Sequence, residues 1–115
     1  MNTACFHAKR FHTASSVSEN RVVTFGGCHS EYVHLNDVNI FDLSDFVKSG
    51  GRETNITCLK VEFKKGSLVP SSRWGHTASV YQDCIYVHGG RNDHDISDLH
   101  LFDPNVLSWS EIELK

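Results

Sequence analysis

The amino-acid sequence predicts an all-β protein made of two four-stranded antiparallel units that follow one another along the chain. Two observations predict this fold class. One set of residues occurs twice in the same order at a nearly constant offset, which is typical of repeat architectures. Short stretches rich in Val, Ile, Tyr, Phe and Trp lie between turn residues, and none has the 3.6-residue apolar period of a helix.

The repeat comprises the segments RFHTASSV, RVVTFGG and LNDVNIFDL, which return in the same order as RWGHTASV, CIYVHGG and ISDLHLFDP. The offset is 64 residues for the His-Thr pair, 63 for the glycine pair and 61 for the two later aspartates. The recurring positions are His12, Thr13, Gly26, Gly27, Asp37 and Asp42 in the first unit and His76, Thr77, Gly89, Gly90, Asp98 and Asp103 in the second. Four kinds of feature in one order indicate a duplicated structural unit.

Each unit is expected to contain four short strands. In the first unit we expect them at Phe11–Val17, Arg21–Phe25, Asp37–Phe41 and Ile56–Phe63. In the second unit we expect them at His76–Gln82, Cys84–His88, Asp98–Phe102 and Ser108–Glu113. Alternation is clearest in the segment 56–63, where Leu59, Val61 and Phe63 share one face of the predicted strand.

The recurring residues have structural explanations. A glycine pair that closes a strand can take positive φ and lets a neighbouring chain approach closely. Aspartates before the third strand, Asp37 and Asp98, can accept hydrogen bonds from nearby backbone N–H groups, and Asp42 and Asp103 can do the same in the next turn. His-Thr on an innermost strand offers polar groups to adjacent loops. Metal binding is the competing hypothesis for the two histidines, but recurrence at the repeat period favours the structural role.

With Trp109 near the end of the second unit, this order of residues resembles the kelch repeat, a four-stranded propeller blade of about 50 residues. The resemblance implies that the recurring residues and Trp109 form the structural motif of each blade. The first unit departs from it, with Cys58 or Leu59 where the family places tryptophan. The implied organisation is an N-terminal lead-in (1–9), a first blade (10–64) with a long third-to-fourth strand loop (44–55), an inter-blade loop (65–72) and a second blade (73–115).

Two blades make an incomplete β-propeller, because a propeller arranges roughly 4 to 8 blades around a channel. Repeat units need neighbours to cover their apolar faces, so two blades alone are expected to be marginally stable. Three interpretations follow. The chain is part of a longer kelch protein, or it completes a ring by self-association, or it persists as an open two-blade unit.

The resemblance implies that loops at one rim bind a partner, as loops on a rigid scaffold commonly do. These are the loops 28–34, 91–96 and the inter-blade loop. Arg91 is the sharpest candidate because a guanidinium suits carboxylates, including those of an acidic peptide. The partner-binding candidates are Arg91, Asn92, Asp93, His94, Tyr32 and His29. The alternative is an ordinary solvated loop, with Arg91 paired to Asp93 or Asp95.

We therefore expect a protein-interaction module from an adaptor or scaffold protein, which binds a protein or peptide partner. The alternative is a fragment of a kelch-like propeller enzyme, such as a galactose-oxidase-like protein or a sugar isomerase. No catalytic motif, cofactor fingerprint or tight metal-ligand spacing is present in the sequence, so we predict no enzyme activity, cofactor or metal.

The net charge of −3, without a basic stripe, argues against nucleic-acid binding, and no apolar run is long enough to cross a membrane. The four cysteines are far apart and are expected to be reduced, and the protein is expected to be cytoplasmic.

Overall fold

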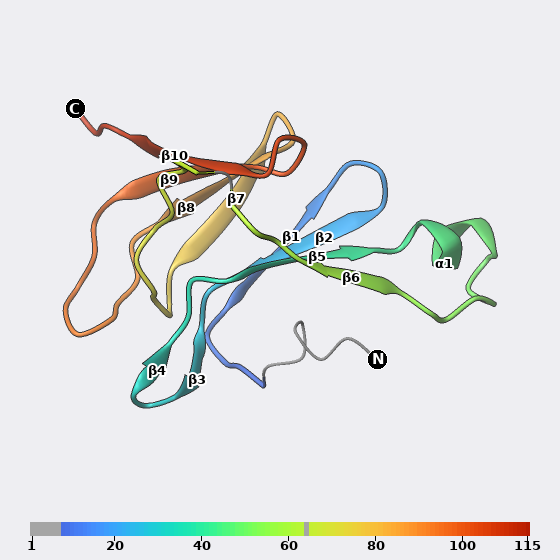
Figure 1. Ribbon diagram of the computed structural model, residues 1–115, viewed down its shortest axis with the longest axis horizontal. Helices are drawn as coiled ribbons and strands as arrows, with labels where there is room; N and C mark the ends of the chain where they lie inside the picture. The colour runs from blue at the N-terminus through green and yellow to red at the C-terminus, as the bar shows by residue number, and fades with distance from the viewer. Residues whose placement is uncertain (1–7, 64) are drawn as a thin grey trace.

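The computed structural model describes residues 8–63 and 65–115, and it is built almost entirely of antiparallel β-sheet (Figure 1). The first four-stranded sheet has the order β1-β2-β5-β6 and the second the order β7-β8-β9-β10. The strands of the first sheet are Thr13–Val17, Arg21–Phe25, Val38–Asp42 and Thr57–Lys60. Those of the second are Thr77–Tyr81, Cys84–His88, Leu99–Asp103 and Ser108–Ile112. The predicted fold class of two four-stranded blades is confirmed.

The two inner hairpins are closed by turns that need positive φ. In the second sheet Tyr81 pairs with Cys84, so Gln82 and Asp83 form a two-residue loop, with φ values of 49° and 61°. Positive φ at both positions is typical of the type I′ turn, whose twist matches that of the flanking strands. The longer β1–β2 turn also uses positive φ, at Glu19 and Asn20. Local turn geometry therefore fixes the register of both inner strand pairs.

The long connections contain structure that the sequence pattern did not predict. The loop 44–55 begins with the short helix α1 (Ser44–Lys48), none of whose residues is buried. The connection from β2 to β5 forms a small hairpin, β3 (Cys28–Ser30) and β4 (Val33–His34), where a loop was expected. The fourth strand of the first sheet stops at Lys60, earlier than expected, although Val61 N–H still bonds to Val38 O at 2.9 Å.

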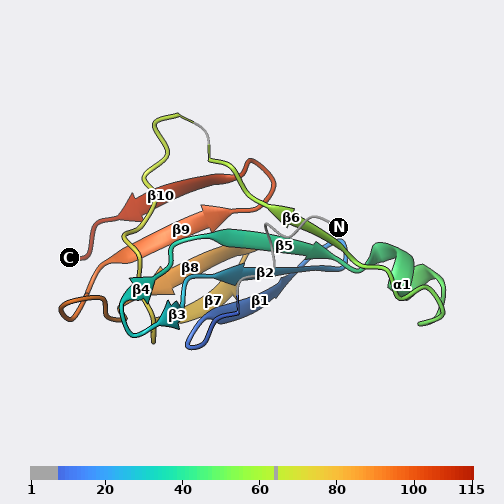
Figure 2. The same ribbon diagram turned by 60° about the horizontal axis from the view of Figure 1, so that its bottom comes forward.

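The hydrophobic core lies between the two sheets, which face each other (Figure 2). The innermost strands β1 and β7 are neighbours, and from them the sheets spread apart toward β6 and β10. Phe25 of the first sheet packs on Trp109 of the second, with ring centroids 4.9 Å apart, and Trp109 also packs on Phe102 at 5.1 Å. The core therefore depends on both blades, as expected for units that cannot cover their own faces.

The cysteines only partly match the expectation of reduced thiols. Cys28 and Cys84 are free thiols, but Cys58 is disulfide-bonded, so the expectation is wrong there. Cys58 lies on the outer strand β6 and is only half-buried, and sequence spacing alone gave no sign that this edge meets another thiol. Cys5 and the rest of residues 1–7 of the predicted lead-in, together with Lys64, lie outside the described residues. None of the helices in the described part of the chain has the length and hydropathy of a membrane span.

Candidate functional site

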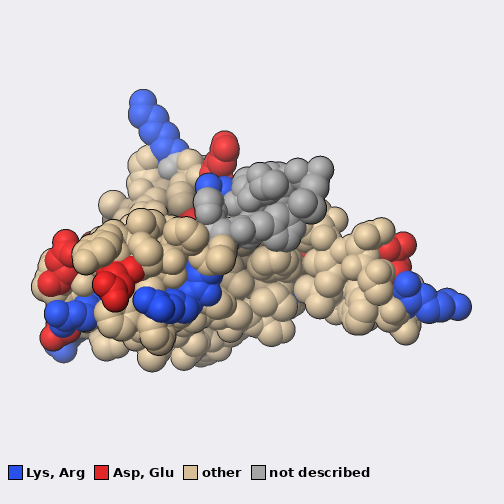
Figure 3. All heavy atoms as spheres, turned by 90° about the horizontal axis from the view of Figure 1, so that it is seen from below, with Lys and Arg blue, Asp and Glu red and all other residues tan. Residues whose placement is uncertain are grey.

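The expected rim is formed where the strands β2 and β8 end. There the residues just before the first strand of each blade, which form the lead-in of that blade (9–12 and 73–76), pair with the residue after its glycine pair. Arg10 pairs with Cys28 and Trp74 with Arg91. The inter-blade segment joins the same rim, because Arg73 N–H bonds to Leu35 O at 2.9 Å. Seen from below, acidic and basic side chains are interspersed rather than gathered into a field of one sign (Figure 3). The rim is therefore a rigid backbone frame with a mixed surface.

The six predicted partner-binding residues all lie on this rim but do not converge. Arg91 Nη1 binds Asp95 Oδ1 at 2.6 Å, which is the ion-paired alternative, and Asn92 donates its side-chain N–H to Ser72 O at 3.2 Å. Asp93 and His94 are exposed in the same loop. On the other blade, His29 Nδ1 is 2.7 Å from Ala8 O, and Tyr32 is 88% exposed at the tip of the β3–β4 hairpin.

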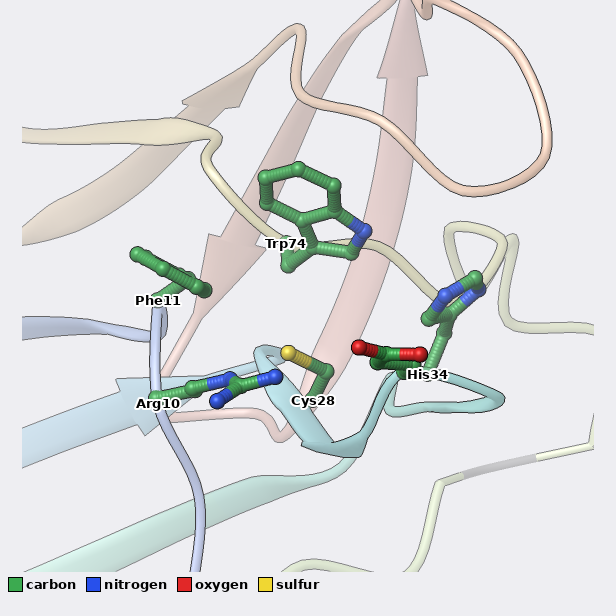
Figure 4. Close-up of a pocket in the computed structure, with 6 residues that line it drawn as sticks. Arg10, Phe11, Cys28, His34 and Trp74 are labelled. Atoms are coloured by element: carbon green, nitrogen blue, oxygen red, sulfur yellow. The ribbon is translucent and has the colours of Figure 1, made fainter.

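A pocket that the sequence reasoning did not single out opens on the rim between the two blades (Figure 4). Its volume is about 220 Å³. The residues that line it are Arg10, Phe11, Cys28, Glu31, His34 and Trp74. Phe11 and Trp74 form one aromatic wall, with ring centroids 5.3 Å apart, and the pocket therefore needs the lead-in segments of both blades.

The backbone of Phe11 has a conformation that is unfavourable for its side chain. Its φ is 59°, and a left-handed conformation costs an L-residue about 1–2 kcal/mol. The repeat offset of 64 places Phe11 opposite Gly75, which has φ 69°. The second blade thus uses glycine where the first holds a 55%-exposed aromatic ring. This substitution within the repeat is the sequence signal that could have identified the pocket.

Arg10 provides the positive charge of the pocket. Its guanidinium carbon lies 5.6 Å from the centre of the Phe11 ring, within cation–π range. Among the described residues it makes no ion pair, whereas the neighbouring Lys9 is bound to Asp37 at 3.0 Å. An exposed guanidinium can donate hydrogen bonds to a carboxylate of a partner, while the aromatic wall beside it contacts an apolar group of the same partner.

Comparison with known proteins identifies the family to which the two sheets belong. The family model described as the KLHDC2/KLHL20/DRC7 Kelch-repeats domain matches residues 1–115. The chain belongs to the kelch-repeat family. Kelch-repeat domains generally mediate protein–protein interactions, which is consistent with a non-enzymatic module.

Several curated proteins are similar to this chain, some over most of its length and others over less than half of it. Tip elongation aberrant protein 3 of Schizosaccharomyces pombe is 32% identical over 113 residues, which cover 82% of this chain and 10% of that protein. Kelch domain-containing protein 3 of Homo sapiens is 32% identical over 108 residues, which cover 88% of this chain and 27% of that protein. Acyl-CoA-binding domain-containing protein 4 of Arabidopsis thaliana is 40% identical over 47 residues, or 40% of this chain and 7% of that protein. The chain thus spans about a quarter or less of each relative.

The kelch glycine pairs allow close approach of other backbone segments. All four glycines, Gly26, Gly27, Gly89 and Gly90, have positive φ. A Cβ on Gly27 would lie 2.7 Å from Arg10 O, and one on Gly90 would lie 2.9 Å from Trp74 O. The second glycine of each pair therefore packs against the lead-in of its own blade, at the base of the rim.

The kelch aspartates before the third strand, Asp37 and Asp98, bind side-chain cations and not the expected backbone N–H groups. Those after it, Asp42 and Asp103, bind backbone N–H groups as expected. Asp98 accepts two hydrogen bonds from Arg73, one of them 2.9 Å long, and Asp37 accepts one from Lys9. Here a cation of the lead-in replaces the expected backbone N–H group, and the hydrogen bonds from Arg73 lower the pKa of Asp98. Asp42 and Asp103 each accept a backbone N–H bond, from residues 44 and 105, at 2.9 Å.

The two kelch histidines have different environments. His12 is exposed, whereas His76 is buried between the blades, with Nε2 2.9 Å from Thr13 Oγ1. Its partner in the repeat motif, Thr77, has its hydroxyl 3.4 Å from His88 O within its own sheet. Burial, assisted by the nearby Arg73 guanidinium, lowers the pKa of His76 from 6.5 to about 4. No group of three His, Cys, Asp or Glu residues in the described ranges is placed to hold a metal ion.

The buried His76 makes the stability of the chain depend on pH. The unfolded chain takes up a proton on this imidazole below about pH 6.5, whereas the folded chain does so only near pH 4. We therefore expect the free energy of unfolding to be highest above pH 6.5 and to fall by about 2–3 kcal/mol between pH 6.5 and pH 4. Urea unfolding across this range measures the effect. His76→Asn should remove most of this slope, and an unchanged slope in the variant would show that other groups cause it.

Proposed function

We propose that this chain is a protein-interaction module from an adaptor or scaffold protein, and that it binds a protein or peptide partner at the rim between its blades. The observation that carries the proposal is Arg10, which makes no ion pair with a described residue and lies beside the Phe11–Trp74 wall in a pocket built by both lead-ins. Arg91 contributes at the edge of this surface, because its backbone pairs with Trp74. An acidic segment fits the guanidinium, and the family assignment supports binding over catalysis.

The enzyme alternative is less well supported. Across the described ranges, the strongly lowered pKa belongs to His76, and burial between the blades explains it without any catalytic partner. A site that uses several blades around a central axis would also need more blades than this chain contains. A cytoplasmic location fits such a module and is part of the same proposal.

Selection of a random peptide display library on the immobilised chain tests the proposed binding. We expect enriched peptides that share an acidic residue and that lose at least about tenfold in affinity with Arg10→Ala. Arg91→Ala should have a smaller effect, because Asp95 already neutralises that guanidinium. Lys60→Ala, on the outer strand β6, is the matched control for loss of one positive charge. Failure to enrich any peptide, or equal binding by all variants, would contradict the proposal.

We also propose that the outer face of the second blade receives a further blade of the same kind. Each blade has one face that corresponds to the same face of the other blade. In the first blade this face is covered by the second blade, and its residues are at most 6% exposed: Val23, Phe25, Val38 and Ile40. The equivalent residues of the second blade, Tyr86, His88, Leu99 and Leu101, are half-buried or exposed. The relatives are several times longer than this chain, which supports a blade from the same polypeptide as the occupant.

The first glycine of each pair supports the same proposal. A Cβ on Gly26 would lie 2.9 Å from Arg73 O and 2.8 Å from His76 Cε1, both of the next blade. At the equivalent position, Gly89, Ile96 O is the one atom of the described residues within 4 Å of such a Cβ, at 3.4 Å. Gly27 N–H also donates to Arg73 O at 2.8 Å, a bond between blades that Gly90 N–H does not make to any described residue.

A chain extended by a second copy of residues 61–115 after Lys115 tests this blade-docking proposal. We expect the Gly90 amide to become as protected from hydrogen exchange as that of Gly27. The added counterpart of His76 should also acquire a lowered pKa in an NMR titration. If the added blade stays unfolded, or folds while the Gly90 amide still exchanges freely, the outer face is not a blade-docking surface.

A further inference from the structure

The pocket between Arg10 and Trp74 is lined by Phe11, an aromatic residue whose backbone is strained. The other non-glycine residues with positive φ in the described ranges lie in turns between consecutive strands, where such conformations are required: Glu19, Asn20, Gln82, Asp83 and Leu107. Phe11 is outside any hairpin turn, and the equivalent residue is glycine. Backbone strain that a simpler residue would relieve is found mainly at functional sites.

The backbone of Phe11 joins the two blades at this point, in addition to the contact of its ring with Trp74. The backbone makes that connection, because Gly75 N–H donates to Phe11 O at 3.0 Å, and this bond does not depend on the side chain. The ring itself is more than half exposed, and it faces the pocket together with Trp74 (Figure 4). A large apolar ring in a strained, exposed position is better explained by a contact with another molecule than by packing within this chain.

We infer that Phe11 and Trp74 form an anchor pocket for one aromatic side chain of the bound partner segment. The volume of about 220 Å³ lies below the roughly 300–1,000 Å³ of small-molecule sites, so it suits a single side chain. Its base is the buried thiol of Cys28, which is 4% exposed, and its wall is two aromatic rings. A central aromatic anchor with a polar rim is the usual arrangement at binding hot spots.

Polar and charged side chains lie beside the aromatic wall and determine how the anchor would be presented. Arg10 lies over the Phe11 ring, and His34 lies on the other side of the pocket (Figure 4). Glu31 also lines the pocket. Water-exposed polar groups at the mouth and apolar groups inside favour a side chain that enters ring first from a solvated peptide backbone. This inference rests on the proposed rim binding and specifies the kind of residue that the rim selects.

Titration of the full chain with N-acetyl-L-phenylalaninamide, followed by the NMR signal of the Trp74 indole N–H, tests the anchor pocket. We expect the signal to shift with a dissociation constant near the millimolar range, and N-acetyl-L-alaninamide to shift it at least tenfold more weakly. Phe11→Gly should weaken binding of the aromatic probe about tenfold or more, while the melting temperature stays the same or rises.

The outcomes separate this inference from the proposed function. If the aromatic probe leaves the Trp74 signal unmoved, or if Phe11→Gly binds it as well as the native chain, the anchor pocket is wrong. A large fall in melting temperature in Phe11→Gly would equally overturn it, because the ring would then be a structural residue. If display peptides still depend on Arg10 in any of these cases, rim binding stands without the anchor.

Discussion

Replacing Arg73 with alanine is expected to lower the free energy of unfolding by about 3–5 kcal/mol, the range seen when one partner of a buried ion pair is removed. The Arg73 side chain is fully buried and is bound to both oxygens of Asp98, with a further bond of 3.1 Å to Gly89 O. Alanine would leave that carbonyl and the carboxylate without these donors. Since domains are stable by only about 5–15 kcal/mol, this single change should unfold a large fraction of a two-blade chain.

The equivalent cation of the first blade is the matched control for this prediction. Lys9 makes one side-chain hydrogen bond, to Asp37 at 3.0 Å, and no second one with the described residues. Lys9→Ala also leaves a mostly buried carboxylate without its cation, because the side chains of Lys9 and Asp37 are only 9% and 14% exposed. It removes one hydrogen bond where Arg73→Ala removes several, so we expect the smaller loss, about 2–3 kcal/mol. Urea unfolding of the two variants measures the difference. Equal losses would mean that burial of the guanidinium and its extra bonds add nothing.

Much of the scaffold was predictable because it is repeated. The glycine pairs and the strands between them follow from a local pattern that occurs twice in a fixed order, and Trp109 was assigned to the motif from the resemblance to the kelch repeat. Trp109 is 3% exposed, in the core between the blades. Repetition turns weak local signals into a strong one, since chance does not reproduce a whole ordered set of features.

The features that were missed depend on tertiary structure or on departures from the repeat. Arg73 looked like an ordinary charged residue, because only the folded arrangement reveals the carboxylate that allows its burial. Helix α1 is too short for periodicity to reveal it. Phe11 could have been noticed by aligning the two units and finding glycine opposite it, but its positive φ is visible only in the structure. Alignment within the chain would therefore have improved the site prediction more than motif matching did.

The candidate site illustrates the same division. The position of the rim was predictable from the positions of the loops. The sequence did not show which side chains on the rim are available to bind a partner. Arg91 stood out by its type and position, yet Asp95 already occupies its guanidinium, whereas Arg10 has no such ion pair among the described residues. Which arginine is available depends on the neighbouring side chains, and sequence position alone does not determine those neighbours.

Gly26→Ala is expected to cost about 3–5 kcal/mol, whereas Gly89→Ala in the same chain should cost only about 1–2 kcal/mol. Both alanines would have to adopt a left-handed conformation, with φ near 67° and 71°, which accounts for about 1–2 kcal/mol in each case. Only at Gly26 does the new methyl group also meet the next blade, 2.9 Å from Arg73 O and 2.8 Å from a carbon of His76. That clash must push the blades apart or distort the strand end, at the usual cost of overpacking.

This pair of variants measures what a neighbouring blade contributes. The two glycines have the same residue type, nearly the same φ and the same place in the repeat, so the difference between their effects isolates the inter-blade contact. Urea unfolding of both variants should show Gly26→Ala as the less stable by about 2 kcal/mol, a value typical of overpacking in a closely packed interior. In the chain extended by a further blade, Gly89→Ala should become as costly as Gly26→Ala. If its effect stayed small there, the added blade would not be packing against the second one as the second packs against the first.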